Sequence, residues 1–182
     1  MGRRVVTLDN AALAEVCARL ERNVMSSGFR PEAILSIATG GIKVGELMFN
    51  KVPHLTTKLQ RPSTKTKKSF VKNIVKRLPR PVQDAMRVAE AGLLELAPTR
   101  PADASQVVLP PLEGLKRILV ADDAVDSGAT LAAVLKAVEQ AAPEAIVMSA
   151  AITVTTRQPL VTPDFAIFNN LTLIRFPWSM DW

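Results

Sequence analysis

The stretch Ile118-Leu-Val-Ala-Asp-Asp-Ala-Val-Asp-Ser-Gly-Ala-Thr-Leu131 decides the fold, because an apolar run, three carboxylates and a helix start follow one another in it. Ile118 to Ala121 has the continuous apolar character of a buried parallel strand. Asp122 and Asp123 stand at the carboxyl end of this strand. Small ligands bind at that edge of an open α/β sheet, so the stretch predicts a ligand site there.

Two glycine-containing turns have the composition of phosphate sites. Ser127 to Thr130 offers backbone amides, a glycine, two hydroxyls and the start of a helix, which together suit a phosphate group. The turn Thr39-Gly40-Gly41 also lies between a strand and a helix, and Lys43 adds a cation. A glycine pair is by itself more typical of a tight turn. The two turns in one chain predict a sugar-phosphate site.

Apolar segments and amphipathic segments alternate along most of the chain, which favours an α/β doubly wound sheet. The exception is the region of about 58–113, which predicts a helical insertion ending in proline-rich sequence. We expect strands at 5–8, 33–38, 118–121, 145–154, 164–168 and 171–176, and helices at 10–27, 42–51, 70–78, 82–96 and 131–143. Asp9 is the expected N-cap of the first helix, and Gly28 its stop.

Length and composition set further bounds. A chain of 182 residues fits a single domain, 1–182, which buries about 70% of its unfolded surface. The single Cys17 excludes an internal disulfide and is typical of a reduced compartment. No apolar run approaches the ~18 residues that span a bilayer. We therefore expect a soluble, cytoplasmic protein without membrane partners.

The net charge of +6 comes from one segment. Residues 51–80 hold ten of the 23 Lys and Arg and no acid, leaving thirteen bases against seventeen acids elsewhere. Such a run is typical of a solvated face or loop. It would also suit a flap over a polyanionic small ligand, or a nucleic-acid surface.

The run Val120-Ala121-Asp122-Asp123-Ala124-Val125-Asp126-Ser127-Gly128-Ala129-Thr130 resembles the phosphoribosyl-pyrophosphate (PRPP) signature of type I phosphoribosyltransferases. Three other segments are similar to bacterial xanthine–guanine phosphoribosyltransferases: Val6-Thr7-Leu8-Asp9, Ala38-Thr39-Gly40-Gly41, and Gln158-Pro159-Leu160-Val161 leading to Phe176-Pro177-Trp178. The resemblance covers most of the chain except the insertion. It implies a mostly parallel sheet with the insertion as a hood or flap, and homodimers or higher homo-oligomers.

The resemblance also implies a role for each part of the motif. Asp122 and Asp123 would hold the ribose hydroxyls and Mg²⁺, since carboxylates suit a hard cation. Asp126 would be the catalytic acid/base, and the Thr39 turn would hold pyrophosphate. The implied PRPP-binding set is Thr39, Gly40, Gly41, Lys43, Asp122, Asp123, Ala124, Val125, Asp126, Ser127, Gly128, Ala129 and Thr130. Cations of the flexible loop would be Lys65, Lys67 and Lys68.

The base pocket departs from the family pattern. Purine enzymes of this group usually present a lysine where Val154, Thr155 or Thr156 stands, and a stacking aromatic ring where Leu173 stands. The acid that commonly follows Pro-Trp is replaced by Ser179, with Asp181 nearby as a further metal candidate. The expected base pocket is Val154, Thr155, Thr156, Leu173, Ile174 and Trp178.

Three functions follow from these patterns. The first is a nucleotide-salvage transferase that moves the phosphoribosyl group of PRPP to a nitrogenous, purine-like base with Mg²⁺. The second is a PRPP-sensing regulator that binds nucleic acid through residues 51–80. The third is a repurposed, non-catalytic family member whose insertion serves a partner protein.

Overall fold

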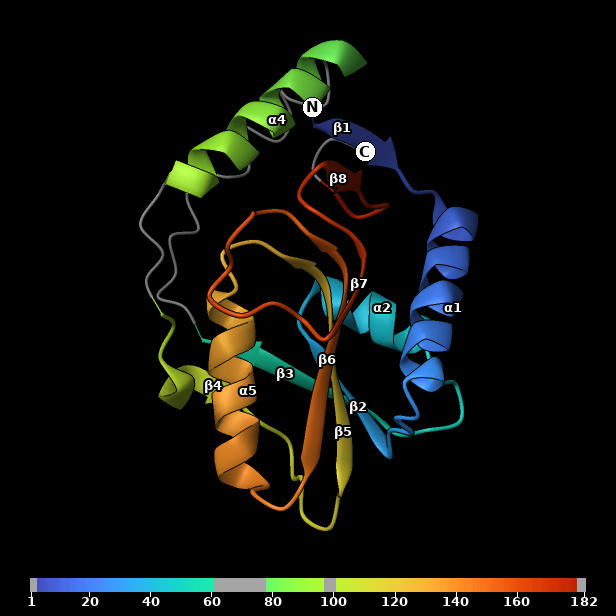
Figure 1. The fold of residues 1–182 in the computed structure, drawn as a ribbon, viewed down its shortest axis with the longest axis vertical. Helices are drawn as coiled ribbons and strands as arrows, with labels where there is room; N and C mark the ends of the chain where they lie inside the picture. The colour runs from blue at the N-terminus through green and yellow to red at the C-terminus, as the bar shows by residue number, and fades with distance from the viewer. Residues whose placement is uncertain (1–2, 61–77, 97–100, 180–182) are drawn as a thin grey trace.

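A six-stranded sheet forms the centre of the protein, for which a computed structural model describes residues 3–60, 78–96 and 101–179 (Figure 1). The strand order is β4-β3-β2-β5-β6-β7, with β4 antiparallel and the other strands parallel. The strands are β2 (Ala33–Ile37), β3 (His54–Leu59), β4 (Val107–Val108), β5 (Arg117–Val125), β6 (Ile146–Val154) and β7 (Phe165–Phe168). This mostly parallel α/β sheet confirms the predicted fold class.

Helices cover both faces of the sheet. Helices α1 (Asn10–Ser26) and α2 (Gly40–Leu47) pack on one face, and α5 (Ala129–Ala141) packs on the other (Figure 1). Alternate side chains of β5 enter opposite cores: Leu119 and Ala121 face α1 and α2, whereas Ile118 and Val120 face α5. Burial on both faces explains the continuous apolar run in this strand.

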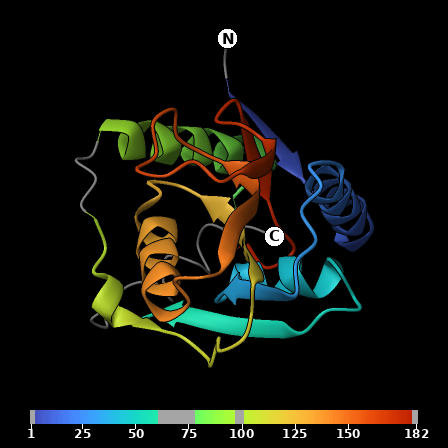
Figure 2. The same ribbon diagram turned by 60° about the horizontal axis from the view of Figure 1, so that its bottom comes forward.

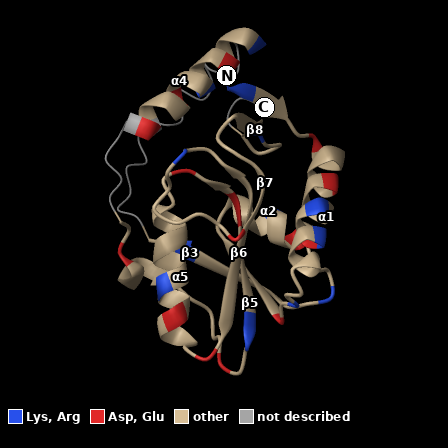
Figure 3. Ribbon diagram, viewed as in Figure 1, with Lys and Arg blue, Asp and Glu red and all other residues tan. Residues whose placement is uncertain are grey.

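Helix α1 follows the predicted amphipathic pattern. The Asp9 carboxylate accepts a hydrogen bond from the Ala12 amide at 2.8 Å and caps the helix. Leu13, Cys17, Leu20 and Val24 form the buried stripe, and Gly28 follows the helix end at φ 87°. Acidic and basic residues are interspersed along α1 (Figure 3).

A second layer lies over the carboxyl end of the main sheet. It consists of a two-stranded parallel sheet, β1 (Arg4–Thr7) and β8 (Thr172–Arg175), and of helix α4 (Arg80–Leu96), which runs beside it (Figures 1 and 2). The buried Arg175 guanidinium pairs with Asp84 of α4, and Arg3 pairs with Glu95. We call this layer of β1, β8 and α4 the hood.

The insertion of about 58–113 is less helical than predicted. It contains α4, but also the short helix η1 (Ala104–Gln106) and β4, which pairs with the end of β3. Strand β3 was not predicted, because its mixed sequence of His, Leu, Thr and Lys lacks an apolar run. The expected strands near both ends of the described chain form, but they pair with each other instead of joining the main sheet. The expected helix 70–78 lies largely outside the described residues.

Candidate active site at the carboxyl end of β5

The acidic pair lies inside strand β5 rather than after it. Pairing of β2 with β5 ends at Ser36 and Ala121, whereas pairing of β5 with β6 continues through Asp122 to Val125. Strand β5 therefore outruns its neighbour β2, and both acids lie beyond the last β2 pair. The prediction that β5 ends at residue 121 was wrong because the acids interrupt the apolar run without ending the ladder.

The two carboxylates have different surroundings. Loss of hydration raises the pKa of Asp122 well above its ordinary value, and the adjacent Asp123 charge raises it further. Asp122 Oδ1 accepts a hydrogen bond from the Asp123 amide at 2.9 Å. Asp123 Oδ2 accepts one from Trp178 Nε1 at 3.0 Å, which ties the acidic pair to the chain after β8. The pair thus combines a carboxyl group shielded from water with one that is oriented by an indole N–H.

The start of helix α2 packs directly against these acids. A Cβ on Gly40 would lie 1.9 Å from Asp123 Oδ2, and one on Gly41 would lie 2.6 Å from the Ala121 carbonyl oxygen. Both glycines belong to the first turn of α2, with Thr39 at the N-cap position, and not to a separate loop. The expected helix 42–51 consequently begins two residues earlier. Free amides of this first turn point to an anion-binding end.

A cleft of about 530 Å³ joins the start of α2 to the acids. We call it the α2 cleft; Thr39, Gly40, Asp122, Asp123, Asp126 and Thr130 are among its lining residues. A smaller pocket of about 250 Å³ adjoins it and is lined by Asp122 and residues 124–131. Backbone amides, hydroxyls and carboxylates thus surround continuous polar space.

The loop from β5 to α5 requires glycine at one position. Gly128 has φ 75° and caps α5, and a Cβ there would lie 2.8 Å from the amide nitrogen and carbonyl oxygen of Val161. The Leu160 amide donates to the Ser127 carbonyl at 2.8 Å and holds the loop against the segment after β6. This contact leaves the first turn of α5 facing the 250 Å³ pocket.

Asp126 is exposed and held by the threonines that follow β6. The Thr155 hydroxyl donates to Asp126 Oδ1 at 2.6 Å, and the Thr156 hydroxyl donates to the Asp126 carbonyl at 2.7 Å. The Thr155 amide donates to the Val125 carbonyl at 2.9 Å. The side chain of Asp126 is therefore a positioned hydrogen-bond acceptor at a pocket wall.

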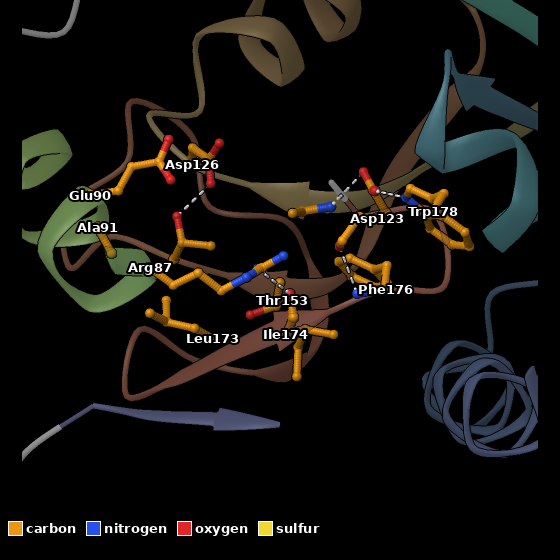
Figure 4. Close-up of a pocket in the computed structure, with 13 residues that line it drawn as sticks. Arg87, Glu90, Ala91, Asp123, Asp126, Thr153, Leu173, Ile174, Phe176 and Trp178 are labelled. Carbon is orange, nitrogen blue, oxygen red and sulfur yellow. Dashed lines mark hydrogen bonds between the residues drawn. The ribbon is translucent and has the colours of Figure 1, made fainter. Parts of the chain in front are cut away.

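A pocket of about 280 Å³ separates the end of the main sheet from the hood (Figure 4). We call it the α4 pocket. Arg87 and Glu90 of α4 line it from one side, and Phe176 and Trp178 stack with ring centroids 5.0 Å apart on another. Arg87 Nη1 donates to the Ile174 carbonyl at 2.9 Å, which fixes the helix to β8. The remaining lining residues are Ala91, Asp123, Ala124, Asp126, Thr153, Thr155, Leu173, Ile174 and Ser179.

A comparison with protein-family models identifies the chain. Residues 7–182 match the model described as "Phosphoribosyl transferase domain". The chain belongs to this phosphoribosyl transferase family. It is accordingly a phosphoribosyltransferase, and PRPP and a nitrogenous base are the substrates that the family implies, as the motif around Asp122 predicted.

Solved structures share the fold of this phosphoribosyltransferase. A purine phosphoribosyltransferase from Pyrococcus horikoshii superposes with a TM-score of 0.60 at 15% identity, covering 96% of this chain and 94% of that one. The Helicobacter pylori xanthine-guanine-hypoxanthine phosphoribosyltransferase gives 0.61 at 18% identity, covering 98% and 95%. A Neisseria gonorrhoeae hypothetical protein with bound ppGpp gives 0.61 at 14%, covering 98% and 91%. No curated protein matches the sequence.

The structure brings most of the predicted site residues of the phosphoribosyltransferase together. The acids, the Thr39 turn and the loop 127–130 line connected space, and Thr155, Leu173, Ile174 and Trp178 line the α4 pocket. Val154 packs into the core on the α5 side instead. Lys43 is exposed, pairs with Glu46 at 3.0 Å and lines another groove, beside α1. Lys65, Lys67, Lys68 and Asp181 lie outside the described residues, as do most bases of the 51–80 segment.

Sequence reasoning missed the contribution of α4. Arg87 and Glu90 are one helical turn apart and face the α4 pocket, as Figure 4 shows. Their spacing on an amphipathic helix was visible, but periodicity does not reveal which surface the polar residues meet. Leu59 of β3 also lines the α2 cleft, because β3 is the strand next to β2.

The acidic pair fits a metal that is also held by a substrate. Within the described part of the chain, no group of three or more His, Cys, Asp or Glu side chains has the arrangement of a complete metal site. Mg²⁺ commonly binds one or two carboxylates together with substrate oxygens and water. Asp122 and Asp123 provide that number of carboxylates.

Among the described residues, no helix is long and apolar enough to cross a membrane.

Proposed function

We propose that this phosphoribosyltransferase transfers the 5-phosphoribosyl group of PRPP to a nitrogenous, purine-like base and releases pyrophosphate, with Mg²⁺ as cofactor. One observation carries the proposal: the α2 cleft and the α4 pocket share Asp123, Ala124, Asp126 and Trp178. A transfer requires the donor carbon and the acceptor nitrogen to be held in contact. Two adjoining cavities with a common acidic wall provide such a meeting point.

PRPP would occupy the α2 cleft and the pocket beside it. Asp122 and Asp123 are suited to hydrogen bonds with the two ribose hydroxyls. The loop 127–130 and the first turn of α5 offer amides to the 5′-phosphate. The amides at the start of α2 would hold the pyrophosphate, because Gly40 and Gly41 let this helix start pack directly against the acids of β5.

Asp126 would accept the proton of the attacking base nitrogen. In the transfer, a nitrogen–carbon bond forms at the anomeric carbon while the bond from that carbon to a pyrophosphate oxygen breaks. The Thr155 hydroxyl donates to Asp126 Oδ1 at 2.6 Å and holds this carboxylate at the wall of the α4 pocket. A positioned carboxylate of this kind contributes about 10²–10⁴ in rate as a general base.

Mg²⁺ would be held by Asp122 and Asp123 together with PRPP oxygens. When bound, it would neutralise charge that develops on the leaving pyrophosphate. The chain itself supplies the two carboxylates, and the hydrogen bond from Trp178 Nε1 fixes the orientation of one of them. The amides of α2 would complete the stabilisation of the leaving group.

Release of pyrophosphate tests this proposal. Purified protein with PRPP, Mg²⁺ and a panel of purine and related bases should release pyrophosphate with at least one base. The Asp126→Asn variant should lower kcat by about 10²–10⁴ while its thermal unfolding stays unchanged. Absence of turnover with every base, or full activity of Asp126→Asn, would contradict the proposed reaction.

We also propose a cytoplasmic, homo-oligomeric enzyme of nucleotide salvage. A single buried Cys17 thiol suits a reducing compartment. Val82, Met86 and Leu93 are exposed apolar side chains of α4 at one-turn and two-turn spacings, as at subunit contacts. Light scattering of the purified protein would measure the oligomeric state.

A further inference from the structure

Hydrogen-bond acceptors outnumber donors among the charged and hydroxyl side chains that line the α4 pocket: the carboxylates of Asp123, Asp126 and Glu90 face the Arg87 guanidinium and the Ser179 hydroxyl, whose oxygen accepts from the Phe176 amide. The hydroxyl proton of Thr155 is given to Asp126, that of Thr153 to the Thr172 carbonyl at 3.3 Å, and the indole N–H of Trp178 to Asp123. The oxygens of these groups keep lone pairs for further contacts. A ligand that offers N–H donors therefore matches this pocket better than one that offers carbonyl oxygens.

Glu90 is an exposed hydrogen-bond acceptor among the residues that line the α4 pocket. It lies on α4, one turn after Arg87, and it has neither a hydrogen-bond partner nor an ion-pair partner among the described residues. Figure 4 shows its side chain at the same end of the pocket as Asp126. Since Asp126 belongs to the proposed proton transfer, Glu90 is the carboxylate available to the edge of the base.

The charge balance of the pocket points the same way. Asp123, Asp126 and Glu90 line it against one guanidinium, that of Arg87, which already donates to the Ile174 carbonyl. A carbonyl oxygen placed beside the exposed Glu90 carboxylate would be repelled by its charge. An amino group placed there would gain a charge-assisted hydrogen bond.

From these contacts we propose that Glu90 is a specificity-determining residue, which selects acceptor bases bearing an exocyclic amino group over bases bearing only oxo groups. The inference rests on the proposed phosphoribosyl transfer for the position of the base. It accounts for a pocket that lacks the expected lysine, because an amino-bearing edge calls for an acceptor. Leu173 and Ile174 would contact the apolar ring face, and Glu90 its polar edge.

Binding of matched bases tests the inference independently of turnover. Guanine and hypoxanthine differ only by an exocyclic amino group, and adenine replaces the oxo group of hypoxanthine with an amino group. Calorimetry with Mg²⁺ and ribose 5-phosphate, which fills the donor side without reaction, should show at least one amino-bearing base binding tenfold or more tighter than hypoxanthine. Glu90→Gln should reduce that ratio about tenfold, since a charged acceptor becomes neutral.

A matched control is Glu139→Gln, which neutralises an exposed carboxylate on α5 outside both cavities. It should leave the preference unchanged. Equal binding of amino and oxo bases, no binding of any purine, or an unchanged preference in Glu90→Gln would overturn the inference. Loss of turnover with the binding preference intact would contradict only the proposed reaction.

Discussion

Gly40 shows how closely the backbone of this phosphoribosyltransferase approaches its acidic pair. An added Cβ would lie 1.9 Å from Asp123 Oδ2 and 2.2 Å from Asp123 Cγ, so the carboxylate would have to move. That carboxylate also accepts the Trp178 indole N–H. Because Gly40 has no side chain, the Asp123 carboxylate and the Trp178 ring that is hydrogen-bonded to it can keep their positions.

Gly40→Ala should lower the affinity for PRPP at least tenfold, because the displaced Asp123 carboxylate would leave the α2 cleft distorted. Titration of PRPP with Mg²⁺ by calorimetry measures this. Gly92→Ala in α4 is the matched control, since its added Cβ has only Arg3 Nη1 within reach, at 4.0 Å. The control should bind PRPP normally and gain up to about 1 kcal/mol of stability from helix propensity. Normal PRPP affinity in Gly40→Ala would contradict the assigned role.

At the scale of the element, the loop from β5 to α5 depends on a left-handed residue pressed against a neighbouring chain segment. Gly128 combines φ 75° with a close approach to Val161, whereas Gly28 at the end of α1 has φ 87° and nothing within 4 Å of an added Cβ. A substitution at Gly28 therefore measures the cost of the left-handed backbone alone, whereas one at Gly128 adds steric overlap with Val161.

Gly28→Ala should destabilise the fold by about 1–2 kcal/mol, the cost of a left-handed non-glycine residue. Gly128→Ala should cost more, because strain and overlap with the Val161 backbone add together, and it should also weaken PRPP binding. Urea unfolding followed by circular dichroism gives both free energies. Equal destabilisation of the two variants would show that the loop relaxes away from residue 161.

The same elements show how far sequence reasoning reaches. The apolar run at 118–121 and the Asp9 cap predicted a strand and a helix correctly, since both signals are local. The ladder through Asp122 to Val125 was not predictable, because it depends on the partner strand β6. Contacts between α4 and β8 cross 87 residues, as for Arg87 and Ile174, and helical periodicity carries no information on them. The individual roles of the site residues remain predictions.

At the scale of the whole molecule, the core on the α1 side contains the only cysteine of the sequence. Cys17 is fully buried, and burial raises the pKa of its thiol to about 12. The folded thiol holds its proton more strongly than the unfolded one, whose ordinary value is 9.0. Its contribution to stability is therefore complete below about pH 9 and is lost as the pH rises from 9 toward 12.

Cys17 should react with a thiol reagent at pH 8 only after denaturation, because the thiolate is the nucleophile and the folded core excludes both charge and reagent. Thiol titration with and without urea measures this. Between pH 9 and 11, the urea midpoint should fall more steeply for the wild type than for Cys17→Ala. Identical slopes would mean that the core does not disfavour the thiolate.

Pairing of β1 with β8 also determines when the α4 pocket can form during synthesis. Arg4 pairs with Thr172, and Leu173 and Ile174 of the same late strand line the pocket. A growing chain can build the sheet from β2 to β6 while these residues are still inside the ribosome, because domains begin folding from the N-terminal side. Contacts across such a separation close slowly. Apart from Trp178, the residues that line the α2 cleft precede β8. Most of the donor cleft can therefore be assembled before the acceptor pocket, and a chain arrested before residue 172 would have the acidic pair without the β8 wall of the base site.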